Sequence, residues 1–256
     1  MKLPRLLLIF LFLPLIVFAD TSAWKLFKST HFLINYQNAG EGLINQVALK
    51  AEGYYNKITD DLGFRRFNFW TWDNRASIYL FDNQEEYMKE TGEPDWSAGR
   101  AKIDSKLIQT YISARGFLDS VFPHELAHII FREMVGFDNP GIPLWLDEGV
   151  ASYQQQETSF DRLGLADKIM QGNFITLNEL NKFDAVVLKT TNRVDLFYLE
   201  SYSLVKYLIA EFGKDKFVHF CQDMRDRKDL ARALRLVYGF NNLSDFESSW
   251  KRYILK

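Results

Sequence analysis

The stretch PHELAHII, residues 123–130, decides how this sequence is interpreted, because it holds two of the four histidines with a glutamate between them. The apolar residues around it predict a buried helix over about residues 120–135. Residues four positions apart lie on one face of a helix, so His124 and His128 can hold a common ligand. Two buried imidazoles beside the buried carboxylate of Glu125 need polar partners, and a metal ion would supply them.

The start of this helix can also be predicted. Asp119 or Ser120 is a suitable N-cap, because either side chain can accept a hydrogen bond from a first-turn backbone N–H group. Pro123 then falls in the first turn, where its missing N–H group costs nothing. The motif is therefore expected close to the N-terminal end of the helix.

A catalytic zinc site has three protein ligands and leaves the fourth position to water, whose pKa the ion lowers to about 7. Glu125 is rotated by about 100° from His124, so it does not share the ligand direction but can reach such a water as a general base. The sequence predicts one zinc ion per chain, with His124 and His128 as ligands. The alternative is an ordinary surface helix that carries two histidines.

No histidine is well placed to be the third ligand. The extended zinc motif has a histidine six residues after the second one, but Met134 stands there. The next histidine along the chain, His219, belongs to a separate predicted helix and is expected to be an ordinary helix residue. A carboxylate is therefore the expected third ligand.

Four acidic residues downstream are candidates for that carboxylate. Glu133 lies about 140° around the helix from His128 and points away, and Asp138 falls in the loop that follows. Asp147 and Glu148 belong to the next predicted helix, which a short connection allows to fold back against the first. The apolar periodicity of that helix does not choose between Asp147 and Glu148.

The two motifs together resemble those of the gluzincin zinc metallopeptidases. HELAH is followed by PLWLDEGVASY, residues 143–153, which is similar to the proline, aromatic–leucine pair, variable residue and Glu-Gly of the peptidase MA-like group of exported proteins. The resemblance implies that Glu148 is the third zinc ligand, with Asp147 a neighbouring acid, and that the fold is thermolysin-like.

The resemblance also implies a tyrosine that stabilises the oxyanion of the tetrahedral intermediate. In FYLESYSLVKYL, residues 197–208, Tyr198 and Tyr202 are four apart, and the resemblance favours Tyr198. Alternatively, both tyrosines only pack in the core. By the same resemblance, the strand over residues 107–112 is expected beside the motif helix, where it can pair with an extended peptide as edge strands do.

The remaining pattern predicts an α+β fold in two lobes. Strand and helix signals alternate up to residue 135, and the pattern is mostly helical after it. We expect an N-terminal α+β lobe, residues 20–135, and a helical lobe with the third ligand, residues 136–256. Strands are expected at 31–36 and 75–81 with a hairpin around Ser105–Lys106, and helices at 41–62, 84–90, 144–156, 194–212, 214–225, 229–238 and 244–253.

Residues 1–19 have the pattern of a secretory signal peptide. Lys2 and Arg5 precede an uninterrupted apolar run, residues 6–18, and Ala19 is the small residue expected at a cleavage site. The run is shorter than the ~20 residues that span a bilayer. We therefore expect a periplasmic or extracellular protein without stable membrane insertion after cleavage, a retained anchor being the alternative.

Charge and cysteine content restrict the partners. Removing Lys2 and Arg5 with that segment leaves 29 of the 31 basic residues against 33 acidic ones, a formal net charge of −4. This charge argues against nucleic acid as a partner, because phosphate binding needs a basic face. The single cysteine, Cys221, cannot form an internal disulfide.

The expected function is therefore zinc-dependent hydrolysis of a peptide or protein substrate, with Glu125 as the base. Two alternatives use the same fold and residues. One is an exported zinc-binding or interaction protein without catalysis, and the other is a zinc hydrolase that does not act on peptides. A base between two ligands speaks against the first alternative, since a structural site does not require one.

Overall fold

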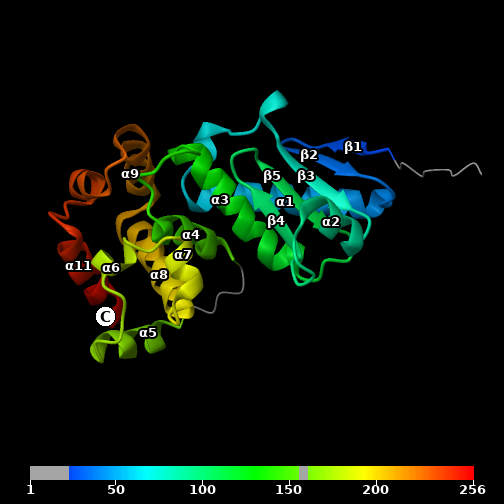
Figure 1. Cartoon of the computed structure of the whole chain (residues 1–256). Helices are drawn as coiled ribbons and strands as arrows, with labels where there is room; N and C mark the ends of the chain where they lie inside the picture. The colour runs from blue at the N-terminus through cyan, green and yellow to red at the C-terminus, as the bar shows by residue number, and fades with distance from the viewer. Residues whose placement is uncertain (1–22, 156–160) are drawn as a thin grey trace, which may run out of the picture.

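The structure, a computed structural model, describes residues 23–155 and 161–256 of the chain. The expected signal peptide, residues 1–19, lies outside the described residues, and so does Gln156, the expected end of the helix at 144–156. The fold is α+β, as the sequence predicts, and all described strands precede the motif helix (Figure 1).

A five-stranded sheet in the order β1-β2-β3-β5-β4 dominates the first half of the chain. The inner strands β2, β3 and β5 are parallel, and each outer strand is antiparallel to its neighbour. Burial alternates along β2 and β3, and the residues buried in the core include Phe32, Ile34 and Ile78. The strands are β1 (Lys25–Lys28), β2 (Phe32–Tyr36), β3 (Ala76–Phe81), β4 (Gly99–Lys102) and β5 (Leu107–Tyr111).

The expected hairpin around Ser105–Lys106 is confirmed, but the expectation that its second strand can pair with a peptide is wrong. Strand β5 lies between β3 and β4 and is paired on both sides. The first strand of the hairpin, β4, is at the edge and lies against the motif helix. The error arises because a hairpin signal does not say which of its strands joins the sheet interior.

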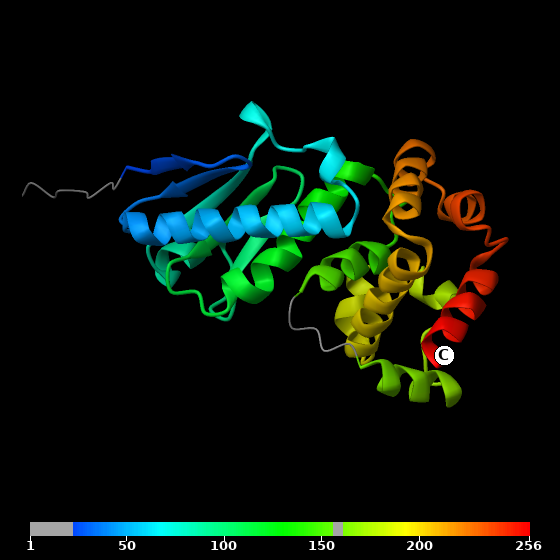
Figure 2. The ribbon, with the colours of Figure 1, turned by 180° about the vertical axis from the view of Figure 1, so that it is seen from behind.

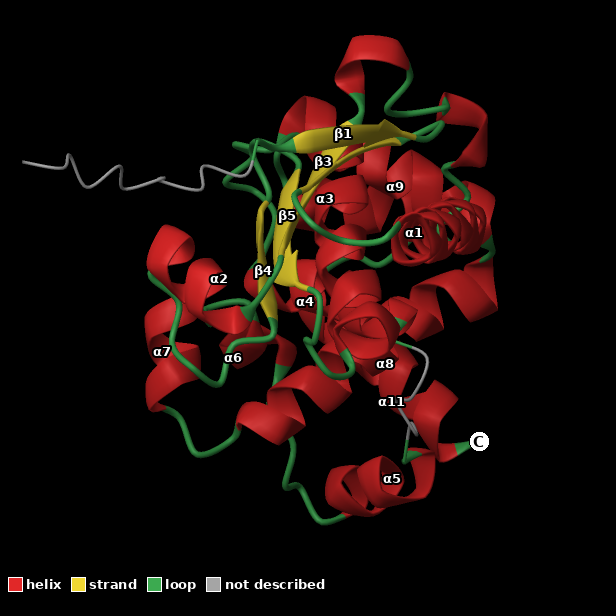
Figure 3. Ribbon diagram, turned by 90° about the vertical axis from the view of Figure 1, so that its right-hand side faces the viewer, coloured by secondary structure: helices red, strands yellow, loops and turns green. Residues whose placement is uncertain are grey.

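Helices cover both faces of this sheet. In Figure 3, α1 (Glu41–Asp61) and α3 (Phe122–Val135) lie on one side of the strands, and α2 (Gln84–Thr91) lies on the other. Figure 2 shows α1 running along the length of the sheet, next to α3. Helix α1 buries one stripe at helical spacing, including Ile44, Ala51 and Ile58.

The second half of the chain is helical. Helix α8 packs closely along α4, and α4 also packs on α3, so the three helices with candidate site residues form one contiguous group. The helices are α4 (Leu144–Gln154), α5 (Arg162–Met170), α6 (Leu177–Leu180), α7 (Ala185–Thr190), α8 (Val194–Phe212), α9 (Lys214–Arg227), α10 (Leu230–Ala233) and α11 (Leu243–Leu255). Shorter turns of helix are η1 (Arg65–Phe67), η2 (Trp72–Asn74), η3 (Phe117–Val121) and η4 (Leu234–Tyr238). The division into two lobes at residue 136 remains a prediction.

Among the strands and α-helices, four were not predicted: β1, α5, α6 and α7. Each has nine residues or fewer, too few for hydrophobic periodicity to be recognised. For α6 a local signal exists, because Thr176 and Glu179 form a capping box in which each side chain bonds the backbone of the other residue.

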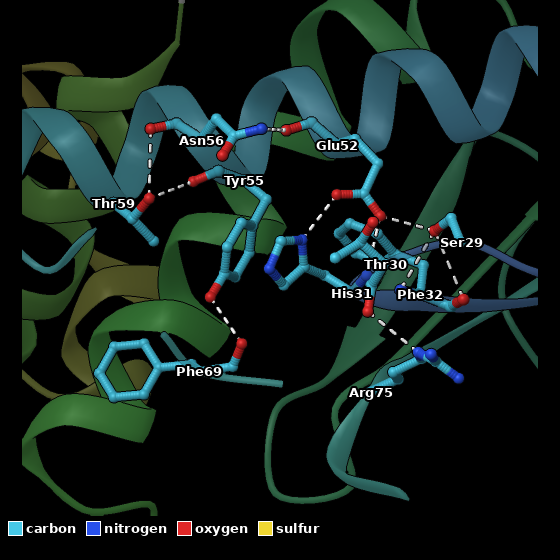
Figure 4. A network of polar contacts seen from close by, with 10 residues as sticks. All are labelled: Ser29, Thr30, His31, Phe32, Glu52, Tyr55, Asn56, Thr59, Phe69 and Arg75. Carbon is cyan, nitrogen blue, oxygen red and sulfur yellow. Dashed lines mark hydrogen bonds and ion pairs between the residues drawn. The ribbon is translucent and has the colours of Figure 1, made fainter. Parts of the chain in front are cut away.

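A polar network joins α1 to the start of β2 (Figure 4). One oxygen of Glu52 accepts hydrogen bonds from Ser29 Oγ at 2.6 Å and from the backbone N–H group of His31 at 2.8 Å. The other oxygen lies 2.6 Å from His31 Nδ1, and the His31 ring stacks on Tyr55. Burial raises the pKa of Glu52, but the bonds from His31 and Ser29 outweigh it and lower that pKa below its ordinary value. His31 thus has a structural partner.

No helix within residues 23–155 and 161–256 is both long enough and apolar enough to cross a membrane.

Candidate metal centre and active site

Helix α3 begins differently from the prediction. A wide helical turn, η3, follows Gly116, and the backbone N–H group of Phe122 bonds Phe117 O. Neither Asp119 nor Ser120 caps α3, whose N-cap residue, Val121, has helical dihedral angles and makes no side-chain bond. The reason is that η3 runs directly into α3, so the chain is already helical there. Pro123 is in the first turn, as predicted.

Three atoms that could bind a metal meet between α3 and α4. His124 Nε2 and His128 Nε2 are 3.2 Å apart, and Glu148 Oε2 is 3.5 Å from the first and 3.7 Å from the second. Two ligands at 2.0–2.1 Å from a tetrahedral zinc ion lie about 3.4 Å apart. These three donor atoms, His124 Nε2, His128 Nε2 and Glu148 Oε2, form a metal triangle. It therefore has the size that a single zinc ion requires.

The polar atoms of this triangle also fit a metal. Glu148 Oε2 is buried and has no hydrogen-bond partner among the described residues. An unpaired buried carboxylate oxygen is costly, and a cation held between it and the two imidazoles would remove that cost. Among the described residues, these three form the one His/Cys/Asp/Glu cluster with metal-ligand geometry.

The loop between α3 and α4 brings Glu148 to the histidines. Gly136 ends α3 with φ at +98°, a conformation that strongly favours glycine. The Asn139 side chain then donates to Val135 O at 2.8 Å and to Met224 O at 3.0 Å, and it accepts from the Gly141 N–H group. These bonds hold the turn that lets α4 fold back on α3.

Gly149, directly after Glu148, allows α4 to approach α8. A Cβ atom at this position would lie 2.4 Å from Ser201 O and 2.8 Å from a methyl group of Val205. The contact with Ser201 is with backbone, which cannot move aside as a flexible side chain can. Any larger residue would therefore push apart the two helices that carry Glu148 and Tyr198.

Asp147 orients His128 from the side opposite the metal triangle. Its Oδ1 lies 3.0 Å from His128 Nδ1, and its Oδ2 accepts bonds from Arg132 Nε at 2.8 Å and Nη2 at 2.6 Å. Burial raises the pKa of Asp147, but His128 and Arg132 outweigh it and lower that pKa. A carboxylate on the outer nitrogen of a ligand histidine fixes its tautomer and ring orientation.

The other candidates for the third ligand lie elsewhere. Glu133 accepts a bond from Trp70 Nε1 at 2.8 Å and pairs with Lys106, while Asp138 is exposed in the loop. His219 is exposed on α9. Arg132 and Asn139 were missed by sequence reasoning, although Arg132 stands one turn after His128 and could have been considered as a partner for an acid on α4.

Glu125 is close to the metal triangle but outside it. Burial raises the pKa of Glu125, Glu148 raises it further, and the two histidines act in the opposite direction. Glu125 directly follows His124 on α3, so the same turn of helix carries this carboxylate and one corner of the triangle.

A cavity of about 560 Å³ opens at His124. The other described residues that line it come from the end of α4 and the start of α8: Ser152, Gln155, Asp195, Tyr198 and Leu199. Burial, together with the charges of Glu148 and Glu125, raises the pKa of Tyr198 to about 12. Tyr198 therefore faces the same cavity as the metal-site histidine, with its hydroxyl protonated at neutral pH.

Tyr202 has a different environment. Its hydroxyl lies 3.4 Å from Lys206 Nζ, its ring packs against Tyr153, and it does not line the cavity. The two tyrosines are one helical turn apart on α8, but the structure brings only Tyr198 to the cavity beside His124.

The match to known families agrees with this geometry. A family model described as the peptidase MA superfamily matches residues 71–256. The chain belongs to the peptidase MA superfamily. The matched part of this peptidase MA domain includes α3, α4 and α8, and so every candidate site residue named above. The superfamily is one of zinc metallopeptidases and is typically zinc-dependent. Comparison with the curated proteins gave no match.

Proposed function

We propose that this protein is an exported zinc-dependent peptidase, with His124, His128 and Glu148 as zinc ligands and Glu125 as general base. The observation that carries the proposal is the triangle of donor atoms, 3.2–3.7 Å on a side, together with a carboxylate, Glu125, that directly follows His124 on the same helix. Export rests on the charged, apolar and small-residue pattern of residues 1–19.

A zinc ion in this triangle would polarise the scissile carbonyl group and lower the pKa of a coordinated water molecule to about 7. The chain's own residues complete the chemistry. Glu125 takes a proton from the attacking water and delivers it to the amine that leaves. The Tyr198 hydroxyl, which faces the cavity, donates a hydrogen bond to the developing oxyanion. Asp147 holds the His128 ring in place throughout.

The substrate would lie along β4. This strand is at the edge of the sheet and lies against α3, and an exposed edge pairs with an extended peptide through main-chain hydrogen bonds. Such pairing would hold a peptide bond next to the metal triangle. Because it uses main-chain groups, it would depend little on the side chains of the peptide. A peptide or protein substrate is thus the kind that this surface accommodates.

The proposal is tested by metal content and by Glu125→Gln. We expect about one zinc per purified chain and cleavage products from a peptide library. Glu125→Gln should keep the zinc and slow hydrolysis by at least about a hundredfold, the usual effect of removing a general base. Glu133→Gln, on the same helix but outside the triangle, is the control and should leave hydrolysis unchanged.

The outcomes separate the alternatives. A chain that binds no zinc after zinc loading overturns the site, and hydrolysis that survives Glu125→Gln overturns the base. Bound zinc without cleavage of any peptide would favour a non-catalytic zinc-binding protein. Cleavage of esters but not of peptides would favour a different zinc hydrolase.

A further inference from the structure

We infer that Asp195 makes the cavity beside His124 a subsite for a positively charged group of the peptide substrate. The inference deepens the proposed peptidase function and rests on it. The positively charged group is an alkylammonium or guanidinium, from a lysine or arginine side chain or from the N-terminus of the peptide.

The position of Asp195 supports the inference. Asp195, Tyr198 and Leu199 line the cavity from one face of α8, since they are three and four residues apart. Asp195 therefore shares a wall with the tyrosine that faces the metal site. At about 560 Å³, the cavity falls within the range of small-ligand sites, about 300–1,000 Å³, and holds a long side chain.

The charges around the cavity point to a cationic occupant. Among the described residues that line the cavity, Asp195 is the acidic one, and none is a lysine or arginine. Within residues 23–155 and 161–256, no ion pair or hydrogen bond engages the Asp195 carboxylate. The nearest basic residue in sequence, Arg193, does not line the cavity.

The apolar part of the wall complements this charge. Tyr198 and Leu199 lie next to Asp195 in the lining. Their apolar surface can pack against the methylene groups that precede the charge of a lysine or arginine side chain. An occupant with an apolar stem and a positive end therefore matches the wall at both positions.

A structural explanation of Asp195 has to be distinguished from this one. Asp195 is in the first turn of α8, where an acidic residue stabilises the helix through its dipole. Asp215 provides a matched control, because it is also an exposed acidic residue in the first turn of a helix, α9, and does not line the cavity. A purely helical role predicts the same behaviour for both residues.

The experiment measures peptide affinity and cleavage separately. Zinc-loaded Glu125→Gln protein is titrated calorimetrically with N-acetylated peptides that differ at one position, lysine, norleucine or glutamate, and the unacetylated peptides form a second arm. We expect the lysine peptide to bind about tenfold more tightly than the norleucine peptide. Asp195→Asn should remove this preference, Asp195→Lys should reverse it in favour of glutamate, and Asp215→Asn should leave it intact.

Cleavage by the otherwise unaltered chain should show the same pattern in kcat/KM. If only the unacetylated peptides gain from Asp195, the group recognised is the N-terminal ammonium; if acetylation has no effect, it is the side chain. Equal affinity for all peptides, absence of binding, or an equal loss for all peptides in Asp195→Asn would overturn the inference. Lysine-selective binding without cleavage would support the subsite and contradict only the peptidase function.

Discussion

His128 Nδ1 lies 3.0 Å from Oδ1 of Asp147, the residue immediately before the proposed ligand Glu148. One turn of α4 thus supplies both the carboxylate for the metal triangle and the carboxylate that orients a histidine of α3. Arg132 binds the other oxygen of Asp147 and so ties the pair to α3. Two consecutive acidic residues therefore have two separate roles at one site.

Asp147→Asn should weaken zinc binding about 10- to 100-fold, the usual cost of losing such an outer partner of a ligand histidine. The physical reason is that an amide no longer compensates the charge of Arg132 or fixes the His128 tautomer. Zinc affinity is measured by competition with a chromogenic chelator. Asp138→Asn, in the exposed loop, is the control; an unchanged affinity in Asp147→Asn would contradict the orienting role.

Gly149→Ala should lower the free energy of unfolding by about 1–3 kcal/mol, because the added methyl group meets the Ser201 carbonyl oxygen. It should also weaken zinc binding, since α4 carries Glu148. Gly53→Ala on α1 is the matched control, as nothing lies within 4 Å of its added Cβ atom; it should be neutral or stabilise by up to about 1 kcal/mol. Chemical denaturation of both variants checks this, and equal effects would count against the close approach.

Tyr198→Phe should reduce kcat by about 10²–10³-fold, the usual effect of removing one oxyanion donor, with zinc content unchanged. Tyr202→Phe, one turn away, should leave kcat within a few-fold, because its hydroxyl contacts Lys206 and not the cavity. Steady-state kinetics on one peptide compares the two variants. A larger loss in Tyr202→Phe would reassign the donor.

Glu52→Gln should destabilise the fold by about 1–3 kcal/mol at neutral pH, because the carboxylate accepts bonds from Ser29 and His31. The folded-state pKa of Glu52 lies below 4.5, so this stabilisation is present above pH 4.5 and is lost as pH falls through the lowered pKa. Unfolding is measured in the presence of a chelator, so that metal binding does not contribute to the measured free energy of unfolding. Glu90→Gln, exposed on α2, is the control, and a pH-independent difference would contradict the mechanism.

Glu200→Gln should become more stable relative to the original chain as pH rises. Burial raises the pKa of Glu200 to about 8, and its Oε2 has no hydrogen-bond partner among the described residues. Between pH 4.5 and 8 the folded state keeps a proton that the unfolded state has released, so the original chain loses stability with rising pH. The Tm difference should grow from pH 5 to pH 9; a constant difference would show that Glu200 is ionised when folded.

The sequence by itself determined the features that depend on local spacing. His124 and His128 are four apart on one helix, so their common direction follows from helix geometry whatever surrounds them. The α+β class and the span of α8, predicted at residues 194–212, follow equally from periodicity and helix stop signals. The resemblance of two short motifs then indicated Glu148.

Only the tertiary structure decided which groups from different elements meet. Asp147 and Glu148 are adjacent, and the angle at which α4 returns to α3 brings one carboxylate to the metal triangle and the other to the outer side of His128. The same packing brings Tyr198 to the cavity and leaves Tyr202 outside it. It also brings β4 rather than β5 to the sheet edge. These outcomes depend on contacts such as Gly149 against Ser201, which join positions far apart in the chain and leave no periodic signal in the sequence.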